Sequence, residues 1–342
     1  MMKYHVLMEY NSPLETKERE IPKPGPGEIL LKSKGLGLCY TDVKVITGQI
    51  PPPIIELPAV PGHEIAGEVV EVGEGVTDIS IGDMGVVYIY VTCHVCEQCT
   101  RGKENLCINL KRVGFEIDGG FAEYMKIPAY NFCPVNKDMP AYEMAIIPDA
   151  MGTTYHAITG LAQVKAGQDV LIVGAGGLGI HAVQIAKLCG ARVIVADQKP
   201  DALALADQYG ADYTFLPEDA QKGVQDLTGG QGVDAVIEIV GAPETLAWSL
   251  PSLKSGNKLI IVGYAPGNPF PLDTMAMHYN EYQIIGSRFM LKTELLQLIK
   301  LVEQDKIKPV VSKTYRFDQV NNAIDSLRER TNLGRIALDL EG

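Results

Sequence analysis

The sequence predicts an α/β protein of two domains, an irregular β barrel or sandwich and a doubly wound parallel sheet, and three observations support this. A chain of 342 residues exceeds one ordinary domain. Before residue 150 it holds short strand-like runs broken by Gly and Pro, such as 27–32, 65–72 and 85–90. From Asp169 the pattern changes to alternating strands and helices, which is typical of a parallel sheet covered by helices.

The sheet domain is predicted from short runs rich in Ile and Val, as buried parallel strands are. These runs are DVLIVG at 169–174, ARVIVAD at 191–197, DAVIEIVG at 234–241 and KLIIVGY at 258–264, with helical segments between them. After 282–288 come a helix, LKTELLQLIKLVEQ, an extended segment, a second helix and the strand GRIALDL. We expect this tail to return to the barrel. The predicted division is therefore 1–150 and 286–342 for the barrel domain, with a cysteine lobe at about 92–108, and 151–285 for the sheet domain.

Composition narrows the class of protein. With 46% apolar and 21% charged residues, the chain has the profile of a folded protein. A net charge of -12 would repel nucleic acid and anionic lipid, so we expect neither as a partner. The N-terminus lacks the apolar core of a signal peptide, and there is no uninterrupted apolar run of about 18 residues. We expect a cytoplasmic protein.

A glycine-rich turn predicts a dinucleotide site. The motif GAGGLG lies directly after the strand DVLIV and before an amphipathic helix. Glycine allows the tight turn, the approach of backbone N–H groups to a pyrophosphate, and the packing of helix on strand. Asp197 lies roughly 20 residues later, where an acid binds the ribose diol and favours NAD over NADP, although Lys199 could soften this preference. The alternative is a glycine turn in an unrelated α/β fold. The predicted contacts are Gly174, Gly176, Gly177, Leu178, Gly179 and Asp197.

Four cysteines predict a closed metal site. Cys93, Cys96, Cys99 and Cys107 have a spacing that can form the tetrahedral sulfur cage of a structural zinc. An iron-sulfur cluster is one alternative, although the fourth ferredoxin spacing is missing. Disulfides are another, disfavoured by a reducing compartment.

Two further segments carry possible ligands, GLCYTD with Cys39 and PGHEIAGEV with His63 and Glu64. With them the chain resembles the zinc-containing medium-chain alcohol dehydrogenase family. The likeness covers the ligand cysteine before T-D, the G-H-E segment, the cysteine lobe, DGGFAEY, the glycine motif and the terminal G-R strand, in the family's order. It implies a GroES-like barrel domain and a Rossmann domain.

The resemblance implies a catalytic zinc held by Cys39, His63 and Asp149, with Glu64 as a nearby acid able to exchange onto the metal. Asp149 stands where many members have cysteine, and a helix cap is its alternative role. Three protein ligands leave the open position that a catalytic zinc requires. With the lobe, two zinc ions per chain are expected.

The resemblance also assigns Asp42, Thr41 and Lys44. Asp42 would orient His63, and Thr41 would pass a proton toward the cofactor ribose. Lys44 stands where many members have the histidine that completes this relay, and it would be protonated unless desolvated. Ribose-bound water is the alternative exit for the proton.

Further cofactor contacts follow from the same comparison. Arg335 matches the family's terminal arginine at the pyrophosphate, whereas Tyr40 stands where a basic residue often sits. Thr153 and Leu178 would lie near the nicotinamide, with core packing as their alternative role, and Val262 is a further predicted cofactor contact.

The implied reaction is reversible hydride transfer from an alcohol to NAD, giving a ketone or aldehyde, with zinc lowering the pKa of the alcohol oxygen. The rigid apolar segment 51–58 favours a hydrophobic secondary or cyclic substrate. Alternatives are a polyol or other specialised zinc dehydrogenase, a zinc-free reductase of activated double bonds, and a non-catalytic nucleotide sensor. The resemblance further implies a homo-oligomer, a tetramer in preference to a dimer, joined through the stretch 258–288.

Overall fold

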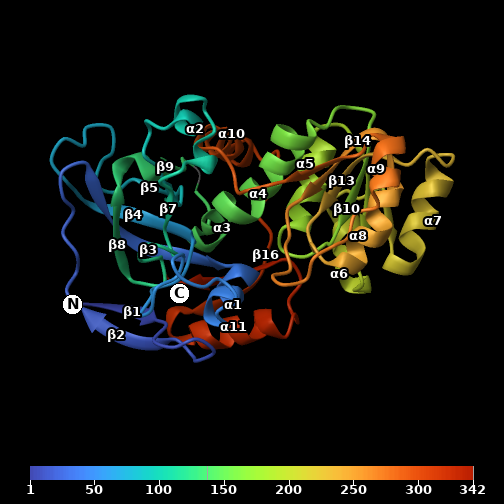
Figure 1. Cartoon of the computed structure of the whole chain (residues 1–342). Coiled ribbons are helices and arrows are strands. Elements are labelled where there is room, and N and C mark those ends of the chain that lie inside the picture. Colours follow the sequence, from blue (N-terminus) through green and yellow to red (C-terminus); the bar gives the residue numbers. More distant parts are fainter. Residues whose placement is uncertain (137, 342) are drawn as a thin grey trace. The chain divides into compact units, whose positions relative to one another are not determined.

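The computed structural model describes residues 1–136 and 138–341, and the chain divides into two compact units (Figure 1). Unit 1 comprises Met1–Ala150, Leu291–Gln304 and Val311–Gly342, and unit 2 comprises Met151–Met290 and Asp305–Val310. This division differs from the predicted one at two points. Unit 2 ends at Met290 instead of 285, and it also includes Asp305–Val310, which the predicted division assigns to the barrel domain.

Unit 1 is built on a seven-stranded sheet within the described residues, in the order β16-β17-β3-β4-β5-β9, with β8 paired to β3. Its strands are β3 (Glu28–Leu38), β4 (Glu64–Val72), β5 (Met84–Val87), β8 (Tyr124–Pro128), β9 (Phe132–Pro134), β16 (Val311–Arg316) and β17 (Arg335–Asp339). Two small ribbons join β1 (Met2–Val6) to β2 (Glu15–Arg19) and β6 (Tyr90–Val91) to β7 (Lys111–Arg112).

The helices of unit 1 are short except for two near the C-terminus. They are α1 (Tyr40–Ile46), α2 (Glu97–Thr100), α3 (Ala141–Ala145), α10 (Lys292–Glu303) and α11 (Val320–Arg328), with 3-10 turns η1 (Glu104–Leu106), η2 (Ala129–Asn131) and η6 (Phe317–Gln319). Helix α10 forms where the sequence predicts it because Leu295, Leu298, Ile299 and Val302 repeat at helical spacing and are all buried.

Three strands of this sheet bring distant segments together. β3 and β4 are antiparallel, with Gly37 opposite Glu64, and β17 is antiparallel to β3, with Ile336 opposite Leu38. Cys39 directly follows β3, while Glu64 and Arg335 begin β4 and β17. The ends of the three strands therefore meet at one place.

Unit 2 holds a six-stranded sheet in the order β12-β11-β10-β13-β14-β15, and every neighbouring pair is parallel. The strands are β10 (Asp169–Val173), β11 (Arg192–Ala196), β12 (Tyr213–Phe215), β13 (Val233–Glu238), β14 (Leu253–Ile261) and β15 (Gln283–Gly286). The helices are α4 (Gly152–Tyr155), α5 (Gly179–Leu188), α6 (Pro200–Gln208), α7 (Pro217–Leu227), α8 (Pro243–Ser249) and α9 (Thr274–Asn280), with η4 (His156–Ala162) and η5 (Leu250–Ser252). The strand order reverses between β10 and β13, and such switch points are where doubly wound sheets bind dinucleotides. The predicted fold class is confirmed.

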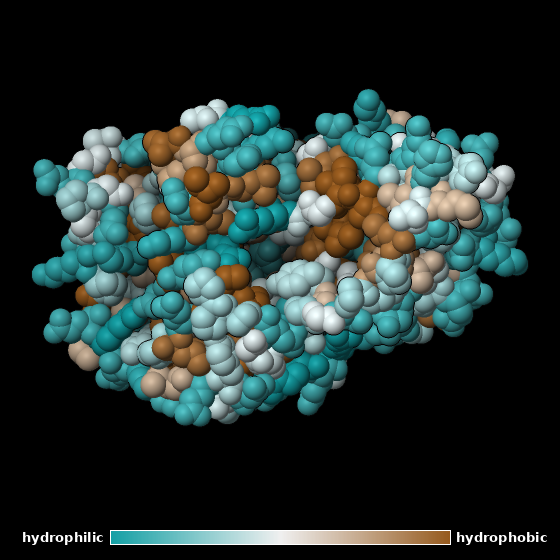
Figure 2. All heavy atoms as spheres, in the orientation of Figure 1, coloured by the Kyte–Doolittle hydropathy of each residue, from teal (hydrophilic) through white to brown (hydrophobic). Residues whose placement is uncertain are grey.

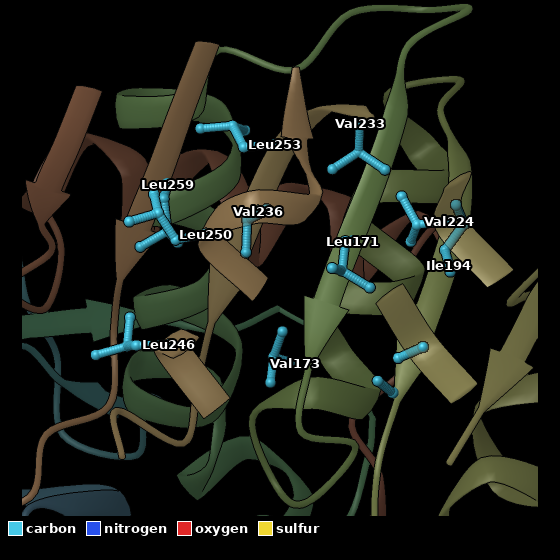
Figure 3. Packing of buried hydrophobic residues seen from close by; sticks show 12 residues of the cluster. Leu171, Val173, Ile194, Val224, Val233, Val236, Leu246, Leu250, Leu253 and Leu259 are labelled. Carbon is cyan, nitrogen blue, oxygen red and sulfur yellow. The ribbon is translucent and has the colours of Figure 1, made fainter. Parts of the chain in front are cut away.

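Apolar side chains on the strands of unit 2 pack against helices α7 and α8 (Figure 3). Leu171 and Val236 are fully buried, and Leu246 of α8 is 6% exposed. Buried strands need apolar residues on both faces, which is why these strands appear in the sequence as continuous Ile and Val runs.

The face shown in Figure 2 is largely hydrophilic, with separate apolar patches. None of the helices in the described part of the chain has the length and apolar character needed to span a bilayer.

Candidate functional site

Three potential metal ligands meet in unit 1. The ligand atoms of Cys39, His63 and Asp149 all lie within 4.8 Å of one another, and all three residues are buried. Each comes from a different element: Cys39 precedes α1, His63 precedes β4, and Asp149 lies in a π-helical turn, η3 (Ile147–Met151). The wide π turn, which is often found at functional sites, holds Asp149 within a helical segment, where it caps no helix start. One thiol, one imidazole and one carboxylate are a donor set that suits zinc.

Asp42 links two of these residues. Its Oδ2 accepts a 2.8 Å hydrogen bond from the backbone N–H of Cys39, and its Oδ1 lies 3.1 Å from His63 Nδ1. The other imidazole nitrogen, Nε2, is thereby directed to the ligand cluster, 3.8 Å from Asp149 Oδ2. A carboxylate behind a metal-binding histidine fixes the orientation of its ring, and this role for Asp42 stays a prediction.

Glu64 and Asp149 share one guanidinium group. Arg335 Nε donates to both carboxylate oxygens of Glu64, at 2.9 and 3.1 Å, and Arg335 Nη2 donates to Glu64 Oε1 and to Asp149 Oδ2. Arg335 is only 4% exposed. A Cβ at position 37 would lie 1.9 Å from Glu64 Oε2, so Gly37 leaves the space that the Glu64 carboxylate occupies. The structure thus directs Arg335 to the two carboxylates, and its expected contact with the cofactor stays a prediction.

Burial and charge perturb these groups strongly. Burial alone would lower the pKa of His63, but Asp42 and Asp149 outweigh it and raise that pKa well above its ordinary value. Burial alone would raise the pKa of Asp149, but its hydrogen bond with His63 and the charge of Arg335 hold that pKa well below its ordinary value. For Glu64, burial raises the pKa and Arg335 opposes the increase. Asp149 is therefore held in its ionised form, with its charge paired to Arg335 and His63.

Thr41 and Lys44 lie on α1 beside this cluster. Thr41 Oγ1 is 3.5 Å from Cys39 Sγ. Lys44 is 9% exposed, and burial, followed by the positive charge of Arg330, lowers the pKa of Lys44 while Cys39 opposes the decrease. The Arg330 guanidinium also lies 5.2 Å from the centre of the Tyr40 ring. A cation therefore lies beside Tyr40, the position at which a basic residue is expected from the resemblance.

The cysteine lobe forms a second cluster. The sulfur atoms of Cys93, Cys96, Cys99 and Cys107 lie within 4.8 Å of one another, and all four are free thiols. This contradicts the disulfide alternative. Backbone N–H groups of Cys99 and Ile108 lower the pKa of Cys96 to about 6, which favours the thiolate that binds a metal.

The glycine-rich turn of unit 2 has the features of a dinucleotide cradle. Gly174 has a positive φ of 98°, and a Cβ on Gly179 would lie 1.9 Å from Gly174 O, so the helix packs on the strand only without a side chain there. A Cβ on Gly176 would meet nothing within 4 Å, which leaves open space over that backbone. Asp197 accepts hydrogen bonds from Ala175 N at 2.7 Å and from Lys199 N at 2.9 Å. A pyrophosphate over this turn would fit these features.

The remaining predicted contacts also lie in unit 2. Leu178 precedes α5, and Thr153 is 8% exposed in α4. Val262 follows β14 and donates its N–H to Glu238 O at 2.8 Å.

One neighbour of these potential ligands was not predicted from the sequence. The ring of Phe115 lies 5.3 Å from the His63 ring, and the Arg112 guanidinium lies over Phe115 at 4.6 Å. Arg112 is itself held by Glu116 through a salt bridge of 2.6 Å. The sequence VGFEIDGG gives no pattern that would have indicated this contact.

Comparison with known proteins identifies the family. Residues 25–141 match the model of the alcohol dehydrogenase GroES-like domain, and residues 177–304 match that of the zinc-binding dehydrogenases. An alcohol dehydrogenase of Geobacillus stearothermophilus is 34% identical over 343 residues, with 99% of each chain covered. The chain belongs to the zinc-dependent medium-chain alcohol dehydrogenase family. The predicted family and the expectation of a dehydrogenase are therefore confirmed.

Two further relatives indicate the range of substrates in this family. An L-threonine 3-dehydrogenase of Pyrococcus furiosus is 36% identical over 332 residues, with 92% of each chain covered. An acetophenone reductase from Geotrichum candidum, solved in complex with NAD, is 32% identical with a TM-score of 0.90, covering 99% of this chain and 97% of the other.

Proposed function

We propose that this alcohol dehydrogenase transfers hydride reversibly between a hydrophobic secondary or cyclic alcohol and NAD, using Cys39, His63 and Asp149 to hold a catalytic zinc. The observation that carries this proposal is the meeting of three buried ligand atoms within 4.8 Å. Zinc held there would act as a Lewis acid that lowers the pKa of the substrate oxygen, and NAD would accept the hydride.

The chain's own residues would orient the ligands and move the proton. Asp42 Oδ1, 3.1 Å from His63 Nδ1, would orient the ring so that Nε2 is left for the metal. Thr41, beside Cys39, would accept the alcohol proton and pass it on. Lys44 would receive it, because its burial lowers the pKa of its ammonium group and so makes the neutral amine more accessible.

Lys44→Met tests the last step of this relay. We expect a lower kcat near neutral pH with little change in KM, and Lys313→Met, on an exposed part of β16, is the matched control. A kcat equal to that of the wild type would favour ribose-bound water as the exit for the proton.

NAD is proposed over NADP because the carboxylate of Asp197 lies next to the glycine-rich turn. That charge would repel the additional phosphate of NADP, and the acetophenone reductase relative was solved with NAD. Measured kcat/KM values for both cofactors test this preference, and Asp197→Asn should reduce it. Equal values for the two cofactors with the wild-type enzyme would contradict the assignment.

The hydrophobic substrate is supported by Phe115, which places an aromatic ring against the ligand His63. A panel of 1-phenylethanol, cyclohexanol, threonine and sorbitol, with NAD reduction as the readout, would test it. Turnover of threonine or sorbitol without turnover of the first two alcohols would favour a polar substrate, as the name of the Pyrococcus relative would suggest.

Two zinc ions per chain are proposed, one at each cluster. Metal analysis of fresh protein, with NAD reduction before and after chelation, tests this. One zinc with no turnover on any alcohol would leave only the cysteine lobe and favour a nucleotide sensor. A coloured protein containing iron would favour an iron-sulfur cluster in the lobe.

The active form is proposed to be a cytoplasmic homotetramer. β15 stands at the edge of its sheet, and on the adjacent α9 Met275 and Tyr279 are 65% and 77% exposed. An edge strand beside exposed apolar side chains can pair with a second copy. The mass in solution tests this, and Tyr279→Lys should lower it if the edge is used.

A further inference from the structure

The segment Asp305–Val310, here called the strap, is bound to the helix that follows the dinucleotide turn. The strap belongs to unit 2, although the elements that precede and follow it in the chain, α10 and β16, belong to unit 1. Gln184 of α5 donates to Lys308 O at 3.0 Å and accepts from Lys308 N at 2.9 Å. Ile307 is 1% exposed, so the strap is also anchored by an apolar side chain.

His181 connects the strap to the glycine-rich turn. It lies one turn before Gln184 on α5 and is fully buried. Its Nδ1 is 2.7 Å from Gly177 O, and its Nε2 accepts the N–H of Val310 at 3.0 Å. A carbonyl can only accept, so Nδ1 carries the hydrogen and Nε2 is the acceptor. Both nitrogens of one neutral imidazole are therefore used, one toward each segment.

The bond to Gly177 fixes the direction of one N–H group of the turn. The carbonyl of Gly177 and the N–H of Leu178 belong to the same planar peptide group and point in opposite directions. When His181 holds the carbonyl on the helix side, the Leu178 N–H must point away from it. Backbone N–H groups of such a turn are the donors that bind pyrophosphate.

We propose that His181 is a positioning residue for the dinucleotide, which makes pyrophosphate binding depend on the strap through the His181 ring and the Gly177 peptide. This inference rests on the proposed binding of NAD at the glycine-rich turn. Because coupling is reciprocal, a bound dinucleotide also strengthens the hold on the strap.

Two substitutions of His181 test separately its hydrogen bond to Gly177 and its hydrogen bond from Val310. The amide of asparagine reaches the position of Nδ1, so His181→Asn keeps a donor for Gly177 and loses the acceptor for Val310. The longer side chain in His181→Gln keeps an acceptor for Val310 and loses the donor for Gly177. We expect each to weaken NADH binding by about three- to tenfold, the worth of one hydrogen bond. His278→Gln, at an exposed histidine of the same unit, is the matched control.

Titrations with NADH, ADP-ribose and AMP provide the readout. NADH and ADP-ribose contain the pyrophosphate and should lose affinity in both variants, whereas AMP should bind as it does to the wild type. Gln184→Leu, which releases Lys308, should give a smaller change in the same direction. If only His181→Gln weakens NADH binding, the strap has no part in binding and the proposal is wrong. Unchanged NADH binding in His181→Gln also overturns the proposal.

If a variant fails to fold, or also loses affinity for AMP, hydrogen exchange in the unsubstituted protein tests the proposal instead. NADH should slow exchange at the amides of Lys308 and Val310, and unchanged exchange at both would overturn the proposal. If the wild-type enzyme does not bind NADH at all, the proposed function fails instead, so the two failures are distinguishable.

Discussion

Replacing Arg335 tests whether the buried charge network stabilises unit 1. Arg335→Met keeps much of the side-chain volume and removes every hydrogen bond that the guanidinium donates to Glu64 and Asp149. The two carboxylates are 1% and 9% exposed, so water replaces the lost donors poorly. Removal of one partner from a buried ion pair costs about 3–5 kcal/mol, because it leaves an uncompensated charge.

This cost converts to a large change in melting temperature. For domains of roughly 150–250 residues, each kcal/mol shifts Tm by about 2–4 °C, so Arg335→Met should lower the Tm of unit 1 by roughly 6–20 °C. Differential scanning calorimetry on chelated and zinc-loaded protein is the assay. The zinc-loaded form should lose less stability, because a divalent cation at Asp149 would replace part of the missing positive charge.

Two control variants make the result interpretable. Arg316→Met removes a guanidinium from a salt bridge with Asp318 in which both side chains are about two-thirds exposed, and it should leave Tm almost unchanged. Arg335→Lys keeps the charge but not the planar fork that serves two carboxylates, so its Tm should lie between those of the wild type and Arg335→Met. Equal Tm values for Arg316→Met and Arg335→Met would refute the argued contribution of the network.

Three further predictions concern the other parts of the molecule. Gly179→Ala puts a Cβ 1.9 Å from Gly174 O and should destabilise unit 2 by about 1–3 kcal/mol in urea unfolding. The Cβ of Gly176→Ala meets nothing within 4 Å, so this variant should weaken NADH binding at unchanged stability. Equal stability of these two variants would contradict the packing argument. Burial raises the pKa of Glu238 above 4.5, so the folded protein binds more protons than the unfolded one, and stability falls as pH rises above about 4.5. The free energy of unfolding of Glu238→Gln relative to wild type should therefore increase between pH 5 and pH 8. A pH-independent difference would count against this argument. Cys96→Ser should remove one zinc per chain in metal analysis and make the lobe sensitive to protease; full retention of metal would show that three thiolates are sufficient.

The sequence predicted well those features that are local in the chain. The strands of unit 2 were visible as Ile and Val runs because both faces of a parallel sheet are buried, and the glycine-rich turn was visible because close packing at Gly179 excludes any side chain. The cysteine lobe was equally clear, since its four cysteines lie within one short segment of the chain.

Contacts between distant segments could not be predicted in the same way. Arg335 reaches Glu64 only because β17 pairs with β3 and β3 with β4, and neither register can be read from the chain. The strap was placed in the barrel domain because its neighbours in sequence are there, whereas its hydrogen bonds to His181 and Gln184 depend on a helix far away in the chain. The packing of Phe115 on His63 is of the same kind.

Asp149 was predicted from its local sequence, whereas its contact with Arg335 depends on distant segments of the chain. The chemistry of its carboxylate gives a final prediction. A thiolate at this position could bind zinc equally well, but it is a weak hydrogen-bond acceptor, whereas a carboxylate can serve a metal and Arg335 together. Asp149→Cys should therefore keep the metal and lose the charge-assisted bond from Arg335, with a loss of about 1.5–3 kcal/mol in stability.

Cobalt substitution separates the two effects of Asp149→Cys. A second thiolate on the metal should strengthen the sulfur-to-cobalt charge-transfer absorption, while calorimetry reports the lost bond. Asp149→Asn is the control, because it keeps the shape but not the charge and should weaken metal retention. If Asp149→Cys binds cobalt and unfolds at the same temperature as the wild type, the Asp149 carboxylate serves only as a metal ligand. Its hydrogen bond from Arg335 then adds nothing to the stability of the fold.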